Sequence, residues 1–231
     1  MKKLIFTLLS TALFAVIVIN ASAQGQSRSV SGFHGIASSG PFNVHVKIDG
    51  RESVRVDADD DVINDIETIV EDNTLKIRFK DRENRHHNIH KAEVYVEARS
   101  LDELTNNGSG FIKVDGTIDA ENFKAVLSGS GNISASVKSS GLHAVISGSG
   151  SINLSGNTGD ANLVVTGSGE IEGKNLKANT ILATITGSGN IHIIAEKSIS
   201  AHITGSGSVY YSGNASMINS HTTGSGRVTR D

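Results

Sequence analysis

The stretch AVISGSGSI at residues 144–152 decides the fold, because its pattern recurs throughout the second half of this 231-residue chain. The tripeptide Gly-Ser-Gly begins at residues 108, 129, 148, 167, 187, 205 and 224, so successive copies lie 18 to 21 residues apart. A flexible Gly/Ser linker has no reason to keep so steady a period. A fixed period of about 20 residues is instead typical of a solenoid, in which each coil is one structural unit.

Apolar residues and glycines alternate with polar residues within each repeat. In the quoted copy, Ala144, Ile146, Gly148, Gly150 and Ile152 all share one parity. Such alternation predicts a strand with one buried face. Strands of successive coils, aligned about 4.8 Å apart, form a parallel sheet wound as a β-solenoid. The other residues of each coil, such as residues 155–159, turn the corner and return.

The same alternation predicts which side chains are buried. We expect one continuous buried column that contains Ile146, Ile152, Val165 and Ile185. The two glycines of each triplet face inward, where the strand bends or the opposite wall comes close. The fold class is therefore all-β, with a strand-rich N-terminal segment that leads into a parallel solenoid of about seven coils of about 19 residues.

The opposite parity predicts an outer surface of small hydroxyl groups that run along the solenoid. The candidate binding residues on it are Ser130, Ser149, Ser168, Ser188, Ser206, Thr166, Thr186 and Thr204. One interpretation is that a tight, solvated bend simply tolerates small polar residues. The other is a flat docking surface for glycans, a partner strand or ordered water.

The first half of the mature chain has a different composition. Residues 24–107 carry 11 Lys and Arg, 16 Asp and Glu and five glycines, whereas residues 108–231 carry eight of each charge and 20 glycines. Alternation at residues 42–48, 75–79 and 94–98 predicts strands, and residues 59–70 could form a short helix. We therefore place a boundary at Gly108, between an N-terminal β domain or cap (24–107) and the repeat solenoid (108–231).

The N-terminus has the features of a secretory signal. Lys2 and Lys3 precede an apolar run at residues 4–19, and Ala21-Ser22-Ala23 follows as an A-x-A cleavage site. The run is shorter than the roughly 20 residues that span a bilayer. We expect residues 1–23 to be a signal peptide that is cleaved after Ala23, with no membrane span in the exported mature chain.

Composition excludes several classes of site. The chain has no Cys, which rules out disulfides and thiolate metal sites. Its formal charge of −3 disfavours nucleic-acid binding. Its 4% aromatic content disfavours the stacked platforms that recognise sugars or bases. We expect no cofactor.

The best enzyme alternative is a β-helical polysaccharide lyase or hydrolase, for which two juxtaposed carboxylates are needed. Glu170 and Glu172 lie on one strand with the same outward parity, about 7 Å apart. The sequence shows neither an obvious basic neighbour nor an aromatic wall beside them. We therefore predict no catalytic residues.

Two other clusters contain metal-ligand residue types. His86, His87 and His90 form an H-H-x-x-H pattern without the Glu of a zinc protease, and Asp57, Asp59, Asp60 and Asp61 lack the Gly and distal Glu of an EF-hand loop. No Asp recurs at any position of the coil, as a calcium-binding β-roll requires. Solvated loops are the preferred interpretation, and we predict no metal site, although the three histidines leave the question open.

The sequence resembles the bacterial domains described as "putative auto-transporter adhesin, head GIN domain". The likeness rests on the GFHGIASSGPFNVHV stretch at residues 32–46 and on the seven triplets followed by Ile or Val. It implies an exported β-helical protein of the periplasm or cell surface of a Gram-negative bacterium.

We therefore predict a non-enzymatic β-solenoid with a binding, adhesive or structural role at the cell envelope; the alternative is the carbohydrate-active enzyme. The expected partners are a glycan or another envelope component, with no nucleic acid. Self-association through the ends or edges of the solenoid is a further expectation.

Overall fold

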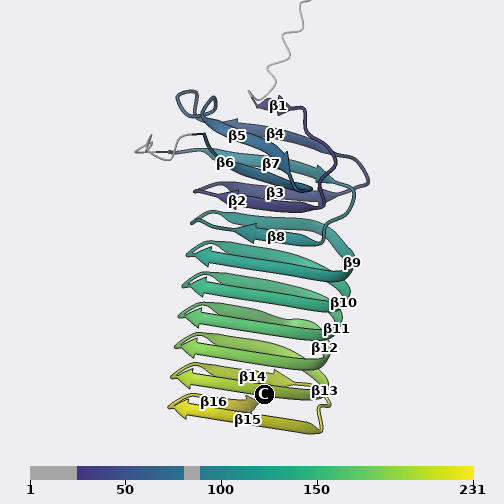
Figure 1. Ribbon diagram of the computed structural model, residues 1–231, viewed down its shortest axis with the longest axis vertical. Helices are drawn as coiled ribbons and strands as arrows, with labels where there is room; N and C mark the ends of the chain where they lie inside the picture. Colours follow the sequence, from purple (N-terminus) through teal and green to yellow (C-terminus); the bar gives the residue numbers. More distant parts are fainter. Residues whose placement is uncertain (1–24, 81–88) are drawn as a thin grey trace, which may run out of the picture.

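The computed structural model describes residues 25–80 and 89–231, which form strands and turns stacked in one column (Figure 1). No helix occurs among them, and accordingly the described chain contains no helical segment able to cross a membrane. The predicted all-β class and parallel solenoid are confirmed. The expected signal peptide, residues 1–23, lies outside the described residues.

Five long strands each make one coil, from one Gly-Ser-Gly triplet to the next. They are β9 (Phe111–Gly129), β10 (Asn132–Gly148), β11 (Ser151–Gly167), β12 (Glu170–Gly187) and β13 (Asn190–Gly205). Neighbouring coils pair in parallel with the triplets in register, so that Gly148 is opposite Gly167 and Gly167 is opposite Gly187. The last coil is formed by β14 (Ser208–Ser212), β15 (Met217–Gly224) and β16 (Arg227–Arg230).

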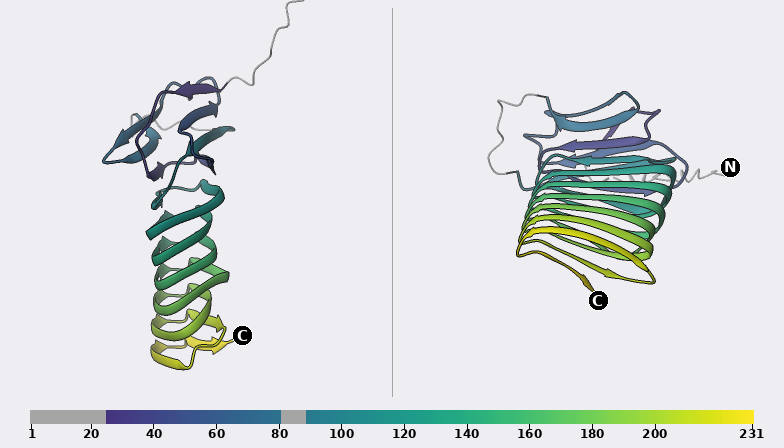
Figure 2. Two further views of the ribbon diagram at one scale, coloured as in Figure 1. Left: turned by 90° about the vertical axis from the view of Figure 1, so that its right-hand side faces the viewer. Right: turned by 60° about the horizontal axis from the view of Figure 1, so that its bottom comes forward.

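The triplet is a corner between two walls, and not the middle of one strand as the alternation suggested. We call the segments before each triplet the leading wall and the segments after it the trailing wall. The long strands end at the first glycine of a triplet, and the next strand begins after the second glycine. At the corner, Ser168 N–H and Gly169 N–H both donate to the carbonyl of Gly148, each at 3.0 Å. The chain therefore reverses there while the stack of coils stays hydrogen-bonded (Figure 2).

The core consists of inward-facing apolar side chains of both walls, aligned in ladders from coil to coil. Ile146, Val165 and Ile185 are aligned on the leading wall, and Ile152 is aligned with Ile133 and Ile171 on the trailing wall. All are fully buried. The expectation of a single column was wrong for Ile152, because the reversal at the triplet carries it to the opposite wall.

The solenoid begins before the repeats. Strand β2 (Gly35–Ser39) pairs in parallel with β8 (Glu103–Asn106), and β3 (Asn43–Ile48) pairs in parallel with β9. The corner between β2 and β3 contains Gly40, Pro41 and Phe42, and the triplet at Gly108 packs directly on their backbone. The sheets therefore continue through Gly108, where the composition changes. The division into two domains there stays a prediction.

A further coil, made of β6 (Thr74–Phe79) and β7 (Ala92–Ala98), lies on the other side of β2 and β3. Antiparallel strands then end the stack: β4 (Ser53–Ala58) pairs with β7, β5 (Ile66–Glu71) with β6, and β1 (Gln26–Arg28) with β4. At the opposite end, β15 and β16 are outermost, and Met217 is 66% exposed.

The expected helix at residues 59–70 is a turn followed by β5. Within residues 59–70, one bond has the spacing of an α-helix, from Ile63 N–H to the carbonyl of Asp59 at 2.9 Å, and two others have the i→i−3 spacing of a turn. Ile66 is buried as its spacing indicated, but pairing with Phe79 on β6 places it in a strand. Tertiary pairing thus overrides a short helical pattern.

Candidate functional site

A row of outward-facing side chains crosses the trailing wall, and its distinctive residues lie near the cap. Starting at β1, the register aligns Ser27, Arg55, Tyr95, His45, Lys113, Ser134, Asn153, Glu172, His192, Tyr210 and Thr229. Residues that are in register on adjacent strands line up in such a ladder on one face of the sheet. Chemically diverse side chains are therefore lined up on one face.

The rings of Tyr95 and His45 stack at the cap end of this row. Their centroids are 5.0 Å apart and the ring planes differ by 12°. The Arg55 guanidinium lies over the other side of Tyr95, 4.3 Å from the ring centroid, which is a cation–π contact. Phe111 meets His45 edge-on, with centroids 5.1 Å apart. Tyr95 nevertheless stays 37% exposed, so the stack is open to a ligand.

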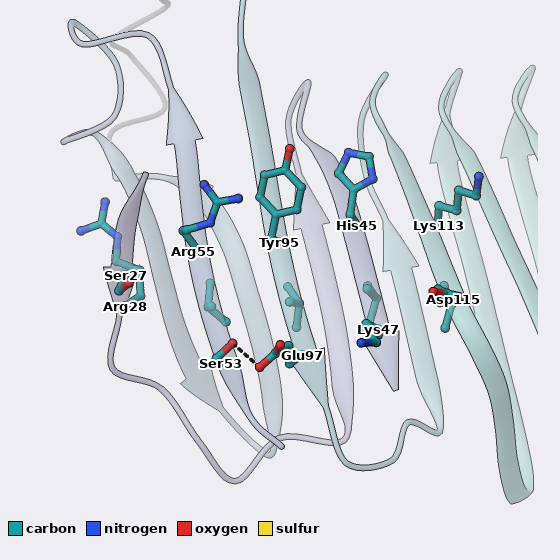
Figure 3. Close-up of a pocket in the computed structure, with 14 residues that line it drawn as sticks. Ser27, Arg28, His45, Lys47, Ser53, Arg55, Tyr95, Glu97, Lys113 and Asp115 are labelled. Atoms are coloured by element: carbon teal, nitrogen blue, oxygen red, sulfur yellow. Dashed lines mark hydrogen bonds between the residues drawn. The ribbon is translucent and has the colours of Figure 1, made fainter. Parts of the chain in front are cut away.

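A depression of about 740 Å³ covers this part of the wall (Figure 3). Arg55, Tyr95, His45 and Lys113 form one row of its lining. A second row, in register on the same strands, consists of Ser53, Glu97, Lys47 and Asp115.

The charges of the depression are not all neutralised by protein partners. Glu97 accepts a hydrogen bond from Ser53 Oγ at 2.9 Å, and His45 Nε2 lies 2.7 Å from Glu93. Lys113 makes no ion pair with any described residue. We call Arg55, Tyr95, His45 and Lys113 the aromatic–basic row. It combines the exposed edge of an aromatic ring with cationic hydrogen-bond donors.

The sequence placed Glu170 and Glu172 outward, and their side chains are 46% and 29% exposed. The expectation of no basic or aromatic neighbour was wrong. His192 Nε2 lies 3.3 Å from Glu170, Lys174 Nζ lies 3.4 Å from Glu172, and Tyr210 stacks on His192. His192 and Tyr210 come from the next two coils. Glu172 and His192 occupy the same position in successive repeats, and aligning the repeats would have predicted this contact.

The residues predicted for the hydroxyl surface are exposed, as expected: Ser130, Ser149, Ser168, Ser188, Ser206, Thr166, Thr186 and Thr204. They lie at the triplet edge, and Thr166, Thr186 and Thr204 are aligned from coil to coil. Their hydroxyls make no hydrogen bond within the described chain. Ligand binding by this surface stays a prediction.

The Asp-rich segment is a structured turn. The carboxylate of Asp57 is buried and lies 2.8 Å from Lys91 Nζ. The expectation that Asp57 is solvated was therefore wrong. Asp59 accepts the backbone N–H groups of His90 at 2.7 Å and Lys91 at 3.0 Å. These two hydrogen bonds hold the pKa of Asp59 below its ordinary value, and the bond from Lys91 has the larger effect. His86 and His87, the first two histidines of the H-H-x-x-H pattern, lie outside the described residues.

Several solved structures share this architecture. A "putative adhesin" from Bacteroides fragilis is 25% identical, with a TM-score of 0.85, over 90% of this chain and 96% of that one. A "putative lipid binding protein" from Parabacteroides distasonis is 22% identical, with a TM-score of 0.73, over 92% and 98%. A "putative adhesin" from Parabacteroides merdae is 20% identical, with a TM-score of 0.69, over 92% and 97%.

No curated protein shows significant sequence similarity to the chain. A family match, in contrast, covers residues 32–215, which include the N-terminal segment from β2 onward, the aromatic–basic row and the repeats as far as β14. By this match the chain belongs to the family described as "Putative auto-transporter adhesin, head GIN domain".

Proposed function

We propose that this protein is an exported binding protein of the bacterial cell envelope, and that the aromatic–basic row holds an acidic glycan. The observation that carries the proposal is the stack of Arg55, Tyr95 and His45, followed on the next strand by Lys113, which has no ion-pair partner among residues 25–80 and 89–231. An adhesive role agrees with the family description.

The chemistry of the row suits a sugar that carries carboxylate, sulfate or phosphate groups. His45 and Arg55 cover the two faces of the Tyr95 ring, so Tyr95 offers a ligand its exposed edge and its hydroxyl. Arg55 supplies a planar fork of donors that matches such anions, and Lys113 supplies a mobile point charge. From Arg55 to Lys113 the row crosses four strands, a span of about 14 Å. A short oligosaccharide could therefore contact the whole row.

Export and an envelope location are part of the proposal. They are supported by the signal-like residues 1–23 and by the adhesin description of the family. Fractionation of cells that express the full chain tests them: the protein should be found outside the cytoplasm, with its N-terminus at Gln24. Protein that stays in the cytoplasm with residues 1–23 attached would contradict this part of the proposal.

We also infer that the role is binding and not catalysis. Glu170 and Glu172, the carboxylate pair of the enzyme alternative, lie at the other end of the trailing wall from the Arg55–Tyr95 stack. The proposed ligand surface therefore contains neither of them.

A glycan array, with phospholipid vesicles as a separate arm, tests the ligand class. The array should contain uronic-acid, sulfated, phosphorylated and neutral oligosaccharides. We expect binding to acidic sugars, at least tenfold weaker in Tyr95→Ala and in Lys113→Ala. The matched control is Lys177→Ala, which removes an exposed lysine from another part of the solenoid. Binding only to neutral sugars or only to vesicles, or equal binding by all variants, would overturn the proposal.

A further inference from the structure

A second cluster on the trailing wall lies far from the aromatic–basic row and has a different chemistry. It brings together Glu170 and Glu172 of β12 and His192 of β13. One potential ligand atom from each lies within 4.8 Å of the other two. His192 is directly opposite Glu172 in the parallel register, and Glu170 is two residues earlier on the same face. Long-range pairing between coils therefore creates the cluster.

Two polar atoms of this cluster are buried without a partner. Oε1 of Glu172 and Nδ1 of His192 are inaccessible to solvent and make no hydrogen bond in the described chain. A buried polar atom without a hydrogen-bond partner is unfavourable. The other oxygen of Glu172, Oε2, lies 3.4 Å from Lys174 Nζ. Oε1 thus keeps its acceptor capacity.

The imidazole of His192 is held in place on the wall. The Tyr210 ring stacks on it with centroids 4.7 Å apart and planes that differ by 12°, and only 16% of the side chain is exposed. Nε2 lies 3.3 Å from Glu170 Oε1, and Nδ1 lies 4.0 Å from an oxygen of Asp231. Both nitrogens of one fixed ring therefore face carboxylates.

We propose that Glu170, Glu172 and His192 bind a divalent transition metal ion, for which Zn²⁺ is the natural probe. One imidazole and two carboxylates are ligands that Zn²⁺ accepts, at about 2.0–2.2 Å. In a tetrahedral site such distances place the ligand atoms about 3.4 Å apart. Rotation of the two glutamate side chains can close the present separations. The ion would pair the buried Glu172 oxygen and a His192 nitrogen, and water or Asp231 would complete the site.

The competing explanation is that the cluster is only a histidine–carboxylate ion pair. That arrangement pairs Nε2 of His192 with Glu170 but leaves Nδ1 and Glu172 Oε1 without a hydrogen bond to any described residue. The two explanations differ in a measurable way, because only the first gives a stoichiometric Zn²⁺ complex that depends on Glu172.

Isothermal titration of the tag-free protein with ZnCl₂ tests the proposal. We expect one Zn²⁺ per chain at this site, with an affinity at least tenfold lower in His192→Gln and in Glu172→Gln. Both side chains are on the outer face, and the melting temperature of each variant in the presence of EDTA confirms that it folds. Zn²⁺ should raise the melting temperature of the wild type and not of these variants.

The matched control removes another pair of histidines. His202 and His221 are opposite each other on β13 and β15, with ring centroids 6.4 Å apart, and both are exposed. The double variant His202→Gln/His221→Gln should bind Zn²⁺ as the wild type does. Loss of binding in this control alone, equal binding by all variants, or no binding by the wild type would overturn the proposal. Glycan binding at the aromatic–basic row is a separate readout and does not depend on the result.

Discussion

A Cβ atom added to Gly169 would lie 2.6 Å from Cγ2 of Ile146, a side chain of the preceding coil. The second glycine of the triplet is buried at the corner, where the leading wall of one coil meets the start of the next. The first glycine, Gly167, has a different constraint, since its φ of +116° is rarely adopted by residues with a side chain. A side chain is therefore disfavoured at both positions, by the backbone conformation at Gly167 and by packing at Gly169.

Substitution within one triplet separates these effects. Gly167→Val and Gly169→Val should each destabilise the protein by about 1–3 kcal/mol, through backbone strain and overpacking. Ser168→Val, between them, is the control and should stay within about ±0.5 kcal/mol, because Ser168 is exposed. Thermal or urea unfolding measures all three. If the glycine variants were as stable as Ser168→Val, the triplets would be spacers and not corners.

The hydroxyl surface can be tested with the same Ser168→Val variant. If this surface binds a ligand, Ser168→Val stays folded and loses binding. Our assignment of glycan binding to the aromatic–basic row instead predicts unchanged binding on the array. A folded Ser168→Val protein that no longer binds would transfer the ligand site to the triplet edge.

A charge placed in the leading-wall ladder tests the parity of the strands. Ile185 is fully buried between Val165 and Ile203 of the adjacent coils. Ile185→Asp would bury an unpaired carboxylate, so we expect a loss of more than about 4 kcal/mol or failure to fold. Thr186→Asp, at the next and exposed position, should change the stability little. Equal melting temperatures for the two variants would mean that the parity is assigned wrongly.

The turn at Asp59 should make stability depend on pH. Its folded-state pKa lies below the ordinary value of 3.8, because the carboxylate accepts N–H groups from Lys91 and His90. The stabilisation is therefore complete above pH 3.8 and is lost as the pH falls through the lower folded-state pKa. Asp59→Ala should lose less stability over this acid range than the wild type, as measured by urea midpoints. Exposed Asp60→Ala is the control, and parallel curves for wild type and Asp59→Ala would refute this account.

The enzyme alternative predicts that Glu170 and Glu172 catalyse polysaccharide cleavage, whereas our proposal predicts that they do not. We expect no turnover of polysaccharides by the purified protein, whether or not Zn²⁺ is added. Reducing-end release and unsaturated-product absorbance would detect hydrolysis and elimination, respectively. Turnover by the wild type that Glu170→Gln or Glu172→Gln abolishes would establish a carbohydrate-active enzyme.

The repeat fold could be predicted from the sequence because one short-range pattern recurs seven times. The period sets the coil, and the parity of Ile146 and Ile152 sets which side chains are buried. Their assignment to opposite walls could not be predicted by parity alone, since a reversal between two inward glycines preserves the alternation. The coil made by β2 and β3 was also hidden, because its corner is Gly-Pro-Phe instead of Gly-Ser-Gly.

The candidate sites depend on pairings that local patterns do not contain. Tyr95 lies 50 residues after His45 in the sequence but is its neighbour in the sheet, because β3 pairs with a strand from much later in the chain. The sequence spacing gives no hint of that contact. Glu172 and His192, by contrast, are one coil apart, and alignment of the repeats would have shown them side by side.

The central claim is that an acidic glycan binds the aromatic–basic row, and mapping the contact by NMR tests it most directly. The ¹⁵N-labelled protein is titrated with an oligogalacturonate, and amide shifts are followed for the wild type and Tyr95→Ala. We predict saturable shifts that are confined to β4, β7, β3 and the start of β9, and that vanish in Tyr95→Ala. Shifts centred on the triplet edge or on β12 and β13, or an unchanged response in Tyr95→Ala, would contradict the account.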